Sequence, residues 1–201
     1  NKFKKTAYEA LSYGKALADK MGSKVSGLVI NCSDTDGLKK YGADKIITID
    51  NPDFQKFSSK KYSHAIAEVI KSENSSVVIL SSSANSKFIG AHLSGITDAA
   101  YVSNVVGIPE SISPFVIKRT CFTNKAFSST EMIDGLKIIS VSSNSFGMIE
   151  NFNDSVVESF NSEKVESNQK IINIEKEKGS VTIADADIVV SAGRGLKGPE
   201  N

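Results

Sequence analysis

The sequence predicts an α/β domain of three layers, in which a mainly parallel sheet lies between helices and carries an added antiparallel hairpin. The first observation is that amphipathic helical patterns alternate along the chain with short, continuous apolar runs. This alternation is typical of βαβ units, whose strands are buried on both faces. The second observation is the pair Asp134-Gly135 between two apolar segments, which favours a hairpin turn. Together they predict a Rossmann-like architecture.

The first predicted element is a helix that begins at a capping box, Thr6 to Glu9, and ends at Gly22. Its apolar stripe consists of Ala7, Ala10, Leu11, Gly14, Leu17, Ala18 and Met21. Strands are expected over residues 25–30 and 45–49, with a short helical turn over residues 37–41 between them. A doubly wound domain normally starts with a strand. Two explanations are therefore open: a strand stands ahead of Asn1, or the helix packs without one.

Beyond Pro52 a second amphipathic helix is marked by Tyr62, Ala65, Ile66, Val69 and Ile70. A compact buried strand is expected over residues 77–80. A third long helix follows, capped by Ser83 or Asn85, with one apolar face made of Phe88, Ile89, His92, Leu93 and Ile96. A strand over residues 101–106 completes this half of the pattern.

From residue 115 to residue 141 short apolar pieces predict antiparallel strands added to the parallel sheet. Residues 163–178 alternate apolar and charged side chains, which indicates a long exposed strand or sheet edge. Residues 182–185 are expected to form one helical turn. The apolar run 188–190 predicts a strand, and Gly193, Arg194 and Gly195 then turn the chain. Ligands lie beyond the carboxyl ends of such strands in open α/β sheets.

Composition excludes several classes of protein. The chain has 24 Lys and Arg against 23 Asp and Glu, so charge gives no case for binding nucleic acid or an anionic membrane surface. No apolar run approaches the roughly 20 residues needed to span a bilayer. Cys32 and Cys121 form no Cys-x-x-Cys pair, so neither a disulfide framework nor a metal site is expected. These features predict a reduced, intracellular, soluble protein.

The serine-rich turn over residues 81–86 is a candidate phosphate loop, because amides at the amino end of a helix attract phosphate. Serine and asparagine are also ordinary helix caps, and no G-x-x-x-x-G-K-S/T motif is present. His92 stands alone on an apolar helix face, which favours a packed or half-buried histidine. His64 is expected to precede a helix and to be solvated.

No Ser-His-Asp or Cys-His order can be placed, which disfavours a small hydrolase. Cys121 lies in an apolar strand and is expected in the core. Asp185 and Asp187 flank a predicted helical turn and are interpreted as caps. No catalytic residue is therefore predicted.

The segment I-V-V-S-A-G-R-G-L-K-G-P-E-N, residues 188–201, resembles the opening of the flavin-binding domain in electron transfer flavoprotein alpha subunits. That family commonly has I-V-V-S-G-G-R-G-L-K with E-N close behind, so Ala192 replaces a glycine. Residues 122–126, F-T-N-K-A, resemble the family's Y-x-G-N/K-A turn, with Asn124 in place of glycine; asparagine tolerates the left-handed conformation better than most residues. Residues 100–105, A-Y-V-S-N-V, are similar to A-x-V-S-D-V, with Asn104 in place of the acid. His92 falls where the family often has arginine.

The resemblance implies that residues 1–185 are the amino-terminal domain of the alpha subunit, adenine nucleotide alpha hydrolase-like in fold. Residues 186–201 would be a linker and the first strand of a truncated FAD-binding domain. It also favours a short strand ahead of Asn1. FAD belongs to the intact subunit, and none is expected on this 201-residue chain. Gly193, Arg194 and Gly195 are the candidate cofactor contacts, although Arg194 serves equally well to face a partner subunit or to hold the turn.

The implied protein is an electron carrier and not an enzyme. It forms a heterodimer with a beta subunit, accepts electrons from acyl-CoA dehydrogenases of fatty acid beta-oxidation and delivers them to a membrane quinone oxidoreductase. The expected location is the cytoplasm of a bacterium, or the mitochondrial matrix of a eukaryote. The alternative is a stand-alone nucleotide-binding module of the same fold that uses residues 81–86 as its phosphate loop.

Overall fold

The computed structural model describes residues 3–169, 171–175, 186 and 188–198, and the chain divides into two compact units, Asn1–Gln169 and Lys170–Asn201. The helices of the first unit are α1 (Lys5–Met21), α2 (Asp36–Lys40), a 3-10 turn η1 (Pro52–Phe54), α3 (Ser59–Glu73) and α4 (Ala84–Thr97). Its strands are β1 (Ser26–Ile30), β2 (Lys45–Ile49), β3 (Val77–Leu80), β4 (Ala100–Val105), β5 (Ser111–Ile112), β6 (Phe115–Cys121), β7 (Ala126–Met132), β8 (Lys137–Val141) and β9 (Val156–Ser159). No helix in the described part of the chain has the length and apolar character to cross a membrane.

The strands form two sheets. The smaller has the order β1-β2-β9, and all its pairs are parallel. In the larger, β8 pairs parallel with both β3 and β4, and β4 then pairs antiparallel with β6. β5 and β7 flank β6, also antiparallel. The prediction of a mainly parallel sheet with an antiparallel addition is confirmed.

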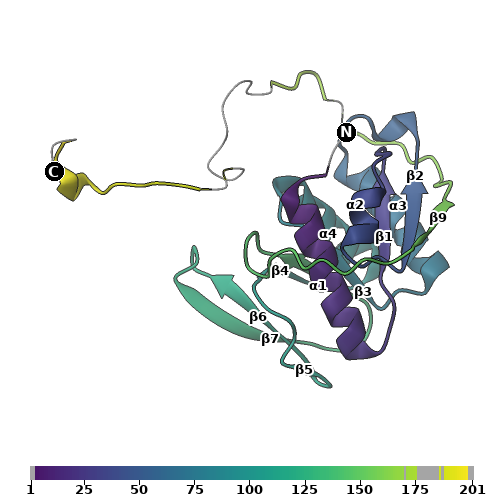
Figure 1. The fold of residues 1–201 in the computed structure, drawn as a ribbon. Coiled ribbons are helices and arrows are strands. Elements are labelled where there is room, and N and C mark those ends of the chain that lie inside the picture. The colour runs from purple at the N-terminus through teal and green to yellow at the C-terminus, as the bar shows by residue number, and fades with distance from the viewer. Residues whose placement is uncertain (1–2, 170, 176–185, 187, 199–201) are drawn as a thin grey trace. The chain divides into compact units, whose positions relative to one another are not determined.

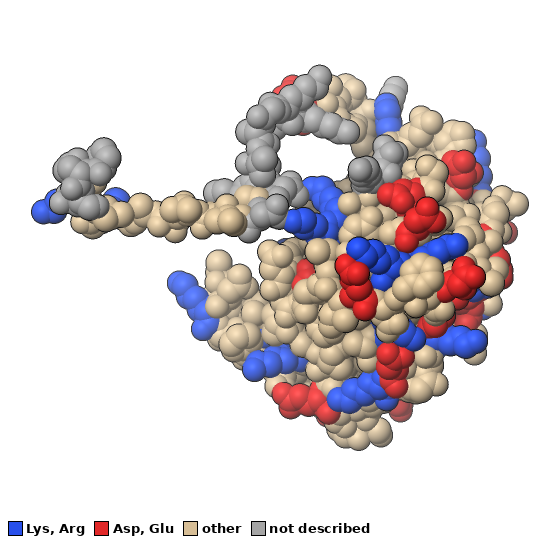
Figure 2. Space-filling model, viewed as in Figure 1, with Lys and Arg blue, Asp and Glu red and all other residues tan. Residues whose placement is uncertain are grey.

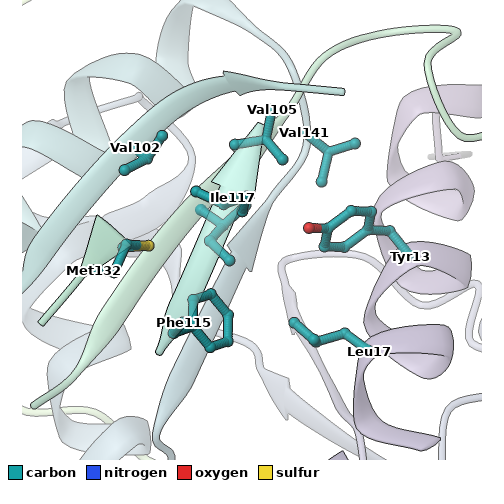
Figure 3. Packing of buried hydrophobic residues seen from close by; sticks show 9 residues of the cluster. Tyr13, Leu17, Val102, Val105, Phe115, Ile117, Met132 and Val141 are labelled. Carbon is teal, nitrogen blue, oxygen red and sulfur yellow. The ribbon is translucent and has the colours of Figure 1, made fainter. Parts of the chain in front are cut away.

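Helices α1 and α3 each pack against both sheets. On one face Leu11 of α1 contacts the smaller sheet, while Tyr13 and Leu17 face the strands of the larger one (Figure 3). On the other face Val69 of α3 packs with the smaller sheet and Ile66 with the larger. In Figure 1, β1, β2 and β9 lie on one side of α1, and β6 and β7 lie on the other. The three predicted layers are therefore present.

The predicted carboxyl end of α1 is correct, whereas its predicted amino-terminal cap is not. Gly22 adopts a left-handed φ of 64° and its amide bonds the carbonyls of Ala18 and Asp19, so the predicted end is confirmed. The capping box is wrong, because α1 begins at Lys5 and no side chain caps it. Thr6 lies inside the first turn, and the carboxylate of Glu9 binds amides far away in the sequence.

The predicted hairpin at Asp134-Gly135 is also wrong. β7 and β8 do not pair; β8 instead lies between β3 and β4 as a central parallel strand. Such a position buries both faces of β8, as its apolar run demands. The actual hairpin joins β6 to β7 through Phe122, Thr123 and Asn124, whose φ angles are 49°, 54° and 62°. The left-handed conformation expected of Asn124 is confirmed.

The apolar face of α4 differs from the prediction. Ile89 and Leu93 are buried and His92 is half-buried, but Phe88 and Ile96 are 63% and 41% exposed. Ser86 and Gly90 take part in the buried face instead. The face is therefore centred on the spacing 86, 89, 90 and 93, which places Phe88 and Ile96 beside it.

The strands expected in the carboxyl-terminal part of the sequence are absent from the described residues there. Residues 163–169 and 171–175 contain no strand, and the strand of this region is the earlier β9. Residues 188–190 form no strand either, and Ile188 and Val190 are 84% and 92% exposed. A strand requires a hydrogen-bonded neighbour, and no strand of the described residues pairs with this segment. The helical turn expected over residues 182–185 lies outside the described residues.

Candidate functional site

The carboxyl ends of the parallel strands are the natural place to look for a site in this architecture. β3 and β8 are parallel neighbours, so the loops that follow them leave the sheet at the same edge. The loop after β3 leads into α4 and contains the serine-rich turn. The loop after β8 runs from residue 142 to residue 155, and its first half approaches α1.

The serine-rich turn behaves as a helix cap. The hydroxyl of Ser83 accepts a hydrogen bond from the amide of Ser86 at 3.0 Å, and the two hydroxyl oxygens lie 2.7 Å apart. Of the two caps that the sequence left open, Ser83 and Asn85, the structure has Ser83. Because these two hydroxyls bind each other and the first turn, they are already engaged at the point where a phosphate would approach.

A convergent group of amides lies in the loop after β8. The amide of Asn144 donates to Oε2 of Glu9 at 2.9 Å, and the amides of Phe146 and Gly147 donate to Oε1 at 2.9 and 3.0 Å. Asn144 and Gly147 have φ angles of 57° and 86°, which turn successive amides toward one point. We call the amides of Asn144, Phe146 and Gly147 the amide nest. Nests of this kind bind anions such as phosphate.

In this chain the anion in the nest is the protein's own carboxylate. Glu9 is only 5% exposed, so its charge is removed from water and compensated by charge-assisted hydrogen bonds. Ser12, one turn further along α1, accepts from the amide of Ile149 at 3.0 Å and extends the same contact. The arrangement fastens α1 to the loop after β8 and occupies the amides that a ligand's phosphate would need.

Tyr13 adds a third polar attachment on α1. Its hydroxyl donates to the carbonyl of Gly107 at 3.0 Å, and burial raises the pKa of the phenol above its ordinary value. The sequence analysis did not find these roles of Glu9, Ser12 and Tyr13. The available signal was the position of polar side chains at helical spacing within a buried face, which predicts partners without saying which.

The two histidines lie close together because α3 packs against α4. Their ring centroids are 6.1 Å apart and the rings are tilted by 53°. His92 is half-buried, as predicted, and its Nδ1 is buried without a hydrogen-bond partner among the described residues. The expectation for His64 is wrong, since it lies inside α3 and is half-buried. Within the described ranges no cluster of three or more potential ligands could hold a metal ion.

The remaining candidates are not brought together. Cys121 ends β6 and is half-buried, so the expectation that it lies in the buried core is wrong. In the second unit, Gly193 precedes the 3-10 turn η2 (Arg194–Leu196), and the backbone amide of Leu196 donates to its carbonyl at 3.0 Å. Gly193, Arg194 and Gly195 are all exposed. Asp185 and Asp187 lie outside the described residues.

The visible surface is mixed in charge. Lys and Arg alternate with Asp and Glu over the face in Figure 2. Lys45, for example, lies 2.9 Å from Glu73 and 2.8 Å from Glu158. Hydrogen bonds to these two carboxylates raise the pKa of Lys45, and the bond to Glu158 has the larger effect. Such pairing agrees with the near-neutral net charge of the sequence.

Comparison with known proteins identifies a protein family that the chain matches. The model of the electron transfer flavoprotein domain matches residues 1–173. The chain is 24% identical over 199 residues to an electron transfer flavoprotein subunit alpha of Bacillus subtilis (strain 168), covering 96% of the chain and 61% of that protein. It is 26% identical over 212 residues to the subunit alpha of Thermoanaerobacterium thermosaccharolyticum, covering 99% and 63%.

A shorter similarity reaches the acryloyl-CoA reductase electron transfer subunit beta of Anaerotignum propionicum, at 31% identity over 78 residues. It covers 37% of the chain and 21% of that protein. The chain therefore spans about three fifths of the length of the alpha subunits that it matches.

Proposed function

The chain belongs to the electron transfer flavoprotein domain family, and we propose that it is the scaffold and subunit-interface domain of an alpha subunit. In this proposal it pairs with a beta subunit in a heterodimer. The assembly accepts electrons from flavin dehydrogenases such as acyl-CoA dehydrogenases and delivers them to a quinone oxidoreductase. It is an electron carrier, and the polypeptide's task is to hold and orient the cofactor.

The amide nest is the observation that carries the scaffold role. A nucleotide-binding domain of this architecture offers free amides at the carboxyl edge to a phosphate. Here Glu9 binds all three amides of the nest, and Ser83 and Ser86 bind each other. These contacts support a domain that is complete in itself at this edge and that leaves nucleotide binding to another part of the assembly.

FAD, when bound to the intact subunit, supplies the redox chemistry. In the second unit the candidate contacts Gly193, Arg194 and Gly195 are compatible with a pyrophosphate, because a guanidinium and flexible backbone amides suit that group. They do not enclose a flavin on their own, since Ile188 and Val190 beside them are largely exposed. We therefore propose that the 201-residue chain binds no FAD by itself.

The test is purification of the 201-residue chain alone, followed by an absorbance spectrum and a chemical reduction. The expected product is colourless and shows no redox change. A stoichiometric yellow flavin that is bleached by dithionite would contradict the proposal. A second arm mixes the chain with a beta subunit and measures complex formation by analytical ultracentrifugation. A stable heterodimer is expected, and failure to associate would contradict the interface role.

A further inference from the structure

The segment that connects β8 to β9 and β9 itself carry a dense group of exposed apolar side chains. Between residues 148 and 157 five such side chains have exposed fractions from 43% to 74%. We call this group the apolar strip: Met148, Ile149, Phe152, Val156 and Val157. It lies within the first unit and shares no residue with the amide nest or the serine-rich turn. Contiguous patches of exposed apolar side chains mark interaction sites.

The backbone beneath the apolar strip is fastened to three other elements. The hydroxyl of Ser12 in α1 accepts from the amide of Ile149 at 3.0 Å and donates to its carbonyl at 3.3 Å. The amides of Asn151 and Asn153 each donate to a carbonyl in the last two residues of α2 at 2.9 Å. β9 then pairs with β2. The segment therefore crosses α1 on a fixed path (Figure 1), and it cannot turn its apolar side chains inward without breaking these bonds.

The polar side chains of this segment point inward. The hydroxyl of Ser155, which is 5% exposed, donates to the carbonyl of Ala43. Nδ2 of Asn153 donates to Oδ1 of Asp44 at 2.8 Å, while the neighbouring Phe152 is 74% exposed. Inward-facing serine and asparagine beside an outward-facing phenylalanine reverse the usual distribution of these residue types. The sequence of the segment therefore suits an outer face that is covered by another apolar surface.

The acidic side chains of the segment are neutralised by lysines of the same domain. Every fourth residue from 150 to 158 is acidic, and each acid lies beside a lysine of α2 or β2: Glu150 and Lys40 at 2.9 Å, Asp154 and Lys39 at 3.8 Å, Glu158 and Lys45 at 2.8 Å. A complementary surface therefore needs no cations to match these acids. An anionic membrane is not favoured, because its attraction depends on unpaired basic residues. The matching surface is uncharged and apolar.

The fixed backbone and the apolar character of the strip indicate a partner that stays bound. Interfaces of obligate complexes are more hydrophobic than others, whereas transient electron-transfer contacts are small. The exposed aromatic side chains Phe122 and Phe127 on the β6–β7 hairpin differ from the strip, because Nζ of Lys118 lies 4.5 Å from the ring centroid of Phe127. A cation at that position calls for an acidic complement. Of the two surfaces, the apolar strip is therefore the one that matches an uncharged, permanent partner.

We propose that the apolar strip is the docking surface for a permanently bound protein subunit that presents an uncharged apolar face, with Phe152 as the central anchor. In the heterodimer proposed above this subunit is the beta subunit, so the inference rests on that proposed function and names the surface that it uses. Docking covers Phe152, Val156 and their neighbours, on a segment whose polar side chains already point inward. Aromatic anchors near the centre of an interface carry a large share of the binding energy.

The test compares serine variants of exposed apolar side chains. Phe152→Ser and Val156→Ser change the apolar strip, and the matched control Phe122→Ser removes an aromatic side chain that is 80% exposed on the β6–β7 hairpin. The native 201-residue chain and each variant are titrated with the beta subunit by calorimetry. The dissociation constant is expected to rise by about 30-fold or more for Phe152→Ser, by about fivefold for Val156→Ser and by less than about twofold for Phe122→Ser.

Two further measurements accompany the titration. Because the three substituted side chains are exposed, the thermal midpoints of the variants should stay close to that of the native chain, which separates lost binding from lost folding. Backbone hydrogen exchange in the complex is expected to slow in residues 148–159 and to stay unchanged in residues 122–124.

Four results would overturn the inference. Native-like binding by Phe152→Ser, with a native chain that binds, would leave the heterodimer standing and remove the strip from its interface. A loss of affinity in Phe122→Ser alone would place the interface on the β6–β7 hairpin. A dimer of the chain alone that Phe152→Ser converts to a monomer in sedimentation would assign the strip to a second copy. Failure of the native chain to bind the beta subunit would contradict the proposed function itself, and the inference with it.

Discussion

The amide nest and strand β3 differ in how completely the rest of the chain covers them. The nest is filled by the chain's own Glu9, with each of its three amides bound at 2.9 to 3.0 Å. β3 stands at the end of the larger sheet, with β8 as its one strand partner among the described residues. The anion site is therefore occupied by the chain's own side chain, whereas one edge of β3 has no strand partner in the described part of the chain.

The same contrast separates β8 from β3. Both are short and apolar, yet Ile138 and Ile139 of β8 are fully buried while all of β3 is half-buried. Among the described residues β8 has a strand on each side, whereas β3 has one strand neighbour. Burial in a sheet is thus decided by neighbours as much as by composition. The closed region, meaning β8 with the amide nest, should respond more strongly to mutation than β3.

The largest effect is expected from Ile139→Ala in the closed region. Ile139 is 0% exposed and packs in the cluster that includes residues of α1 and β4. The substitution removes three carbon atoms and leaves a cavity that the neighbouring side chains cannot fill. The free energy of unfolding should fall by about 4 kcal/mol. Urea denaturation measures it, with Ile139→Val as the matched control at about 1 kcal/mol. A loss below that of the valine control would show that β8 is not a packed core strand.

The next effect is expected from Glu9→Ala. Three amides lose a charged acceptor in a buried place, so the free energy of unfolding should fall by about 3 kcal/mol. Inorganic phosphate should then stabilise the variant by entering the vacated nest, while leaving the native chain unchanged. Thermal denaturation with and without phosphate checks both points. Glu9→Gln keeps the size but not the charge, and it should respond to phosphate less than the alanine variant. Equal phosphate stabilisation of native chain and alanine variant would refute the occupied nest.

A smaller effect is expected from Ile79→Ala in β3, at the end of the larger sheet. Ile79 is half-buried and loses fewer contacts than Ile139, so the loss should be about 1.5 kcal/mol. The measurement is again urea denaturation, compared directly with Ile139→Ala. If the two alanine variants lose the same stability, β3 is as well covered as β8 and the contrast between the regions disappears.

The smallest effect at neutral pH is expected from Tyr13→Phe, at about 1 kcal/mol for the lost bond to Gly107. Burial raises the pKa of Tyr13, so the unfolded phenol, with its ordinary pKa near 10, ionises before the folded one. This stabilising contribution is complete below about pH 10 and is lost as pH rises toward the folded pKa. Burial also raises the pKa of Tyr62 and Tyr101.

The alkaline loss of stability should therefore be reduced in Tyr13→Phe, but not abolished. Unfolding free energies of both proteins between about pH 8 and pH 11 measure the difference. Parallel pH profiles would mean that Tyr13 ionises as easily in the folded chain as in the unfolded one.

The sequence was sufficient where structure is decided locally. The end of α1 at Gly22, the cap of α4 at Ser83 and the left-handed turn at Asn124 follow from short-range chemistry, and all three are present. The sequence did not predict contacts between residues that lie far apart along the chain. Glu9 was assigned to a local capping box, although its amides lie 135 to 138 residues away.

Strand pairing shows the same limit. Asp134-Gly135 carries a hairpin signal, but β8 pairs with β3 and β4, which lie far earlier in the chain. β9 was missed because its four exposed residues, V-V-E-S, show no periodicity of their own and pair with the distant strand β2. The candidate sites predicted from the sequence were residues 81–86 and 193–195, and the amide nest in the loop after β8 was not predicted. The expectations for Gly193, Arg194 and Gly195 stay predictions.

The central claim is that this domain's anion site is closed by its own side chain, so that it serves as a scaffold and not as a nucleotide carrier. The direct measurement is calorimetric titration of the 201-residue chain with AMP and with ATP. The account predicts no saturable heat for either nucleotide. One-to-one binding that is abolished by Ser83→Ala would contradict it and would establish the stand-alone nucleotide-binding module instead.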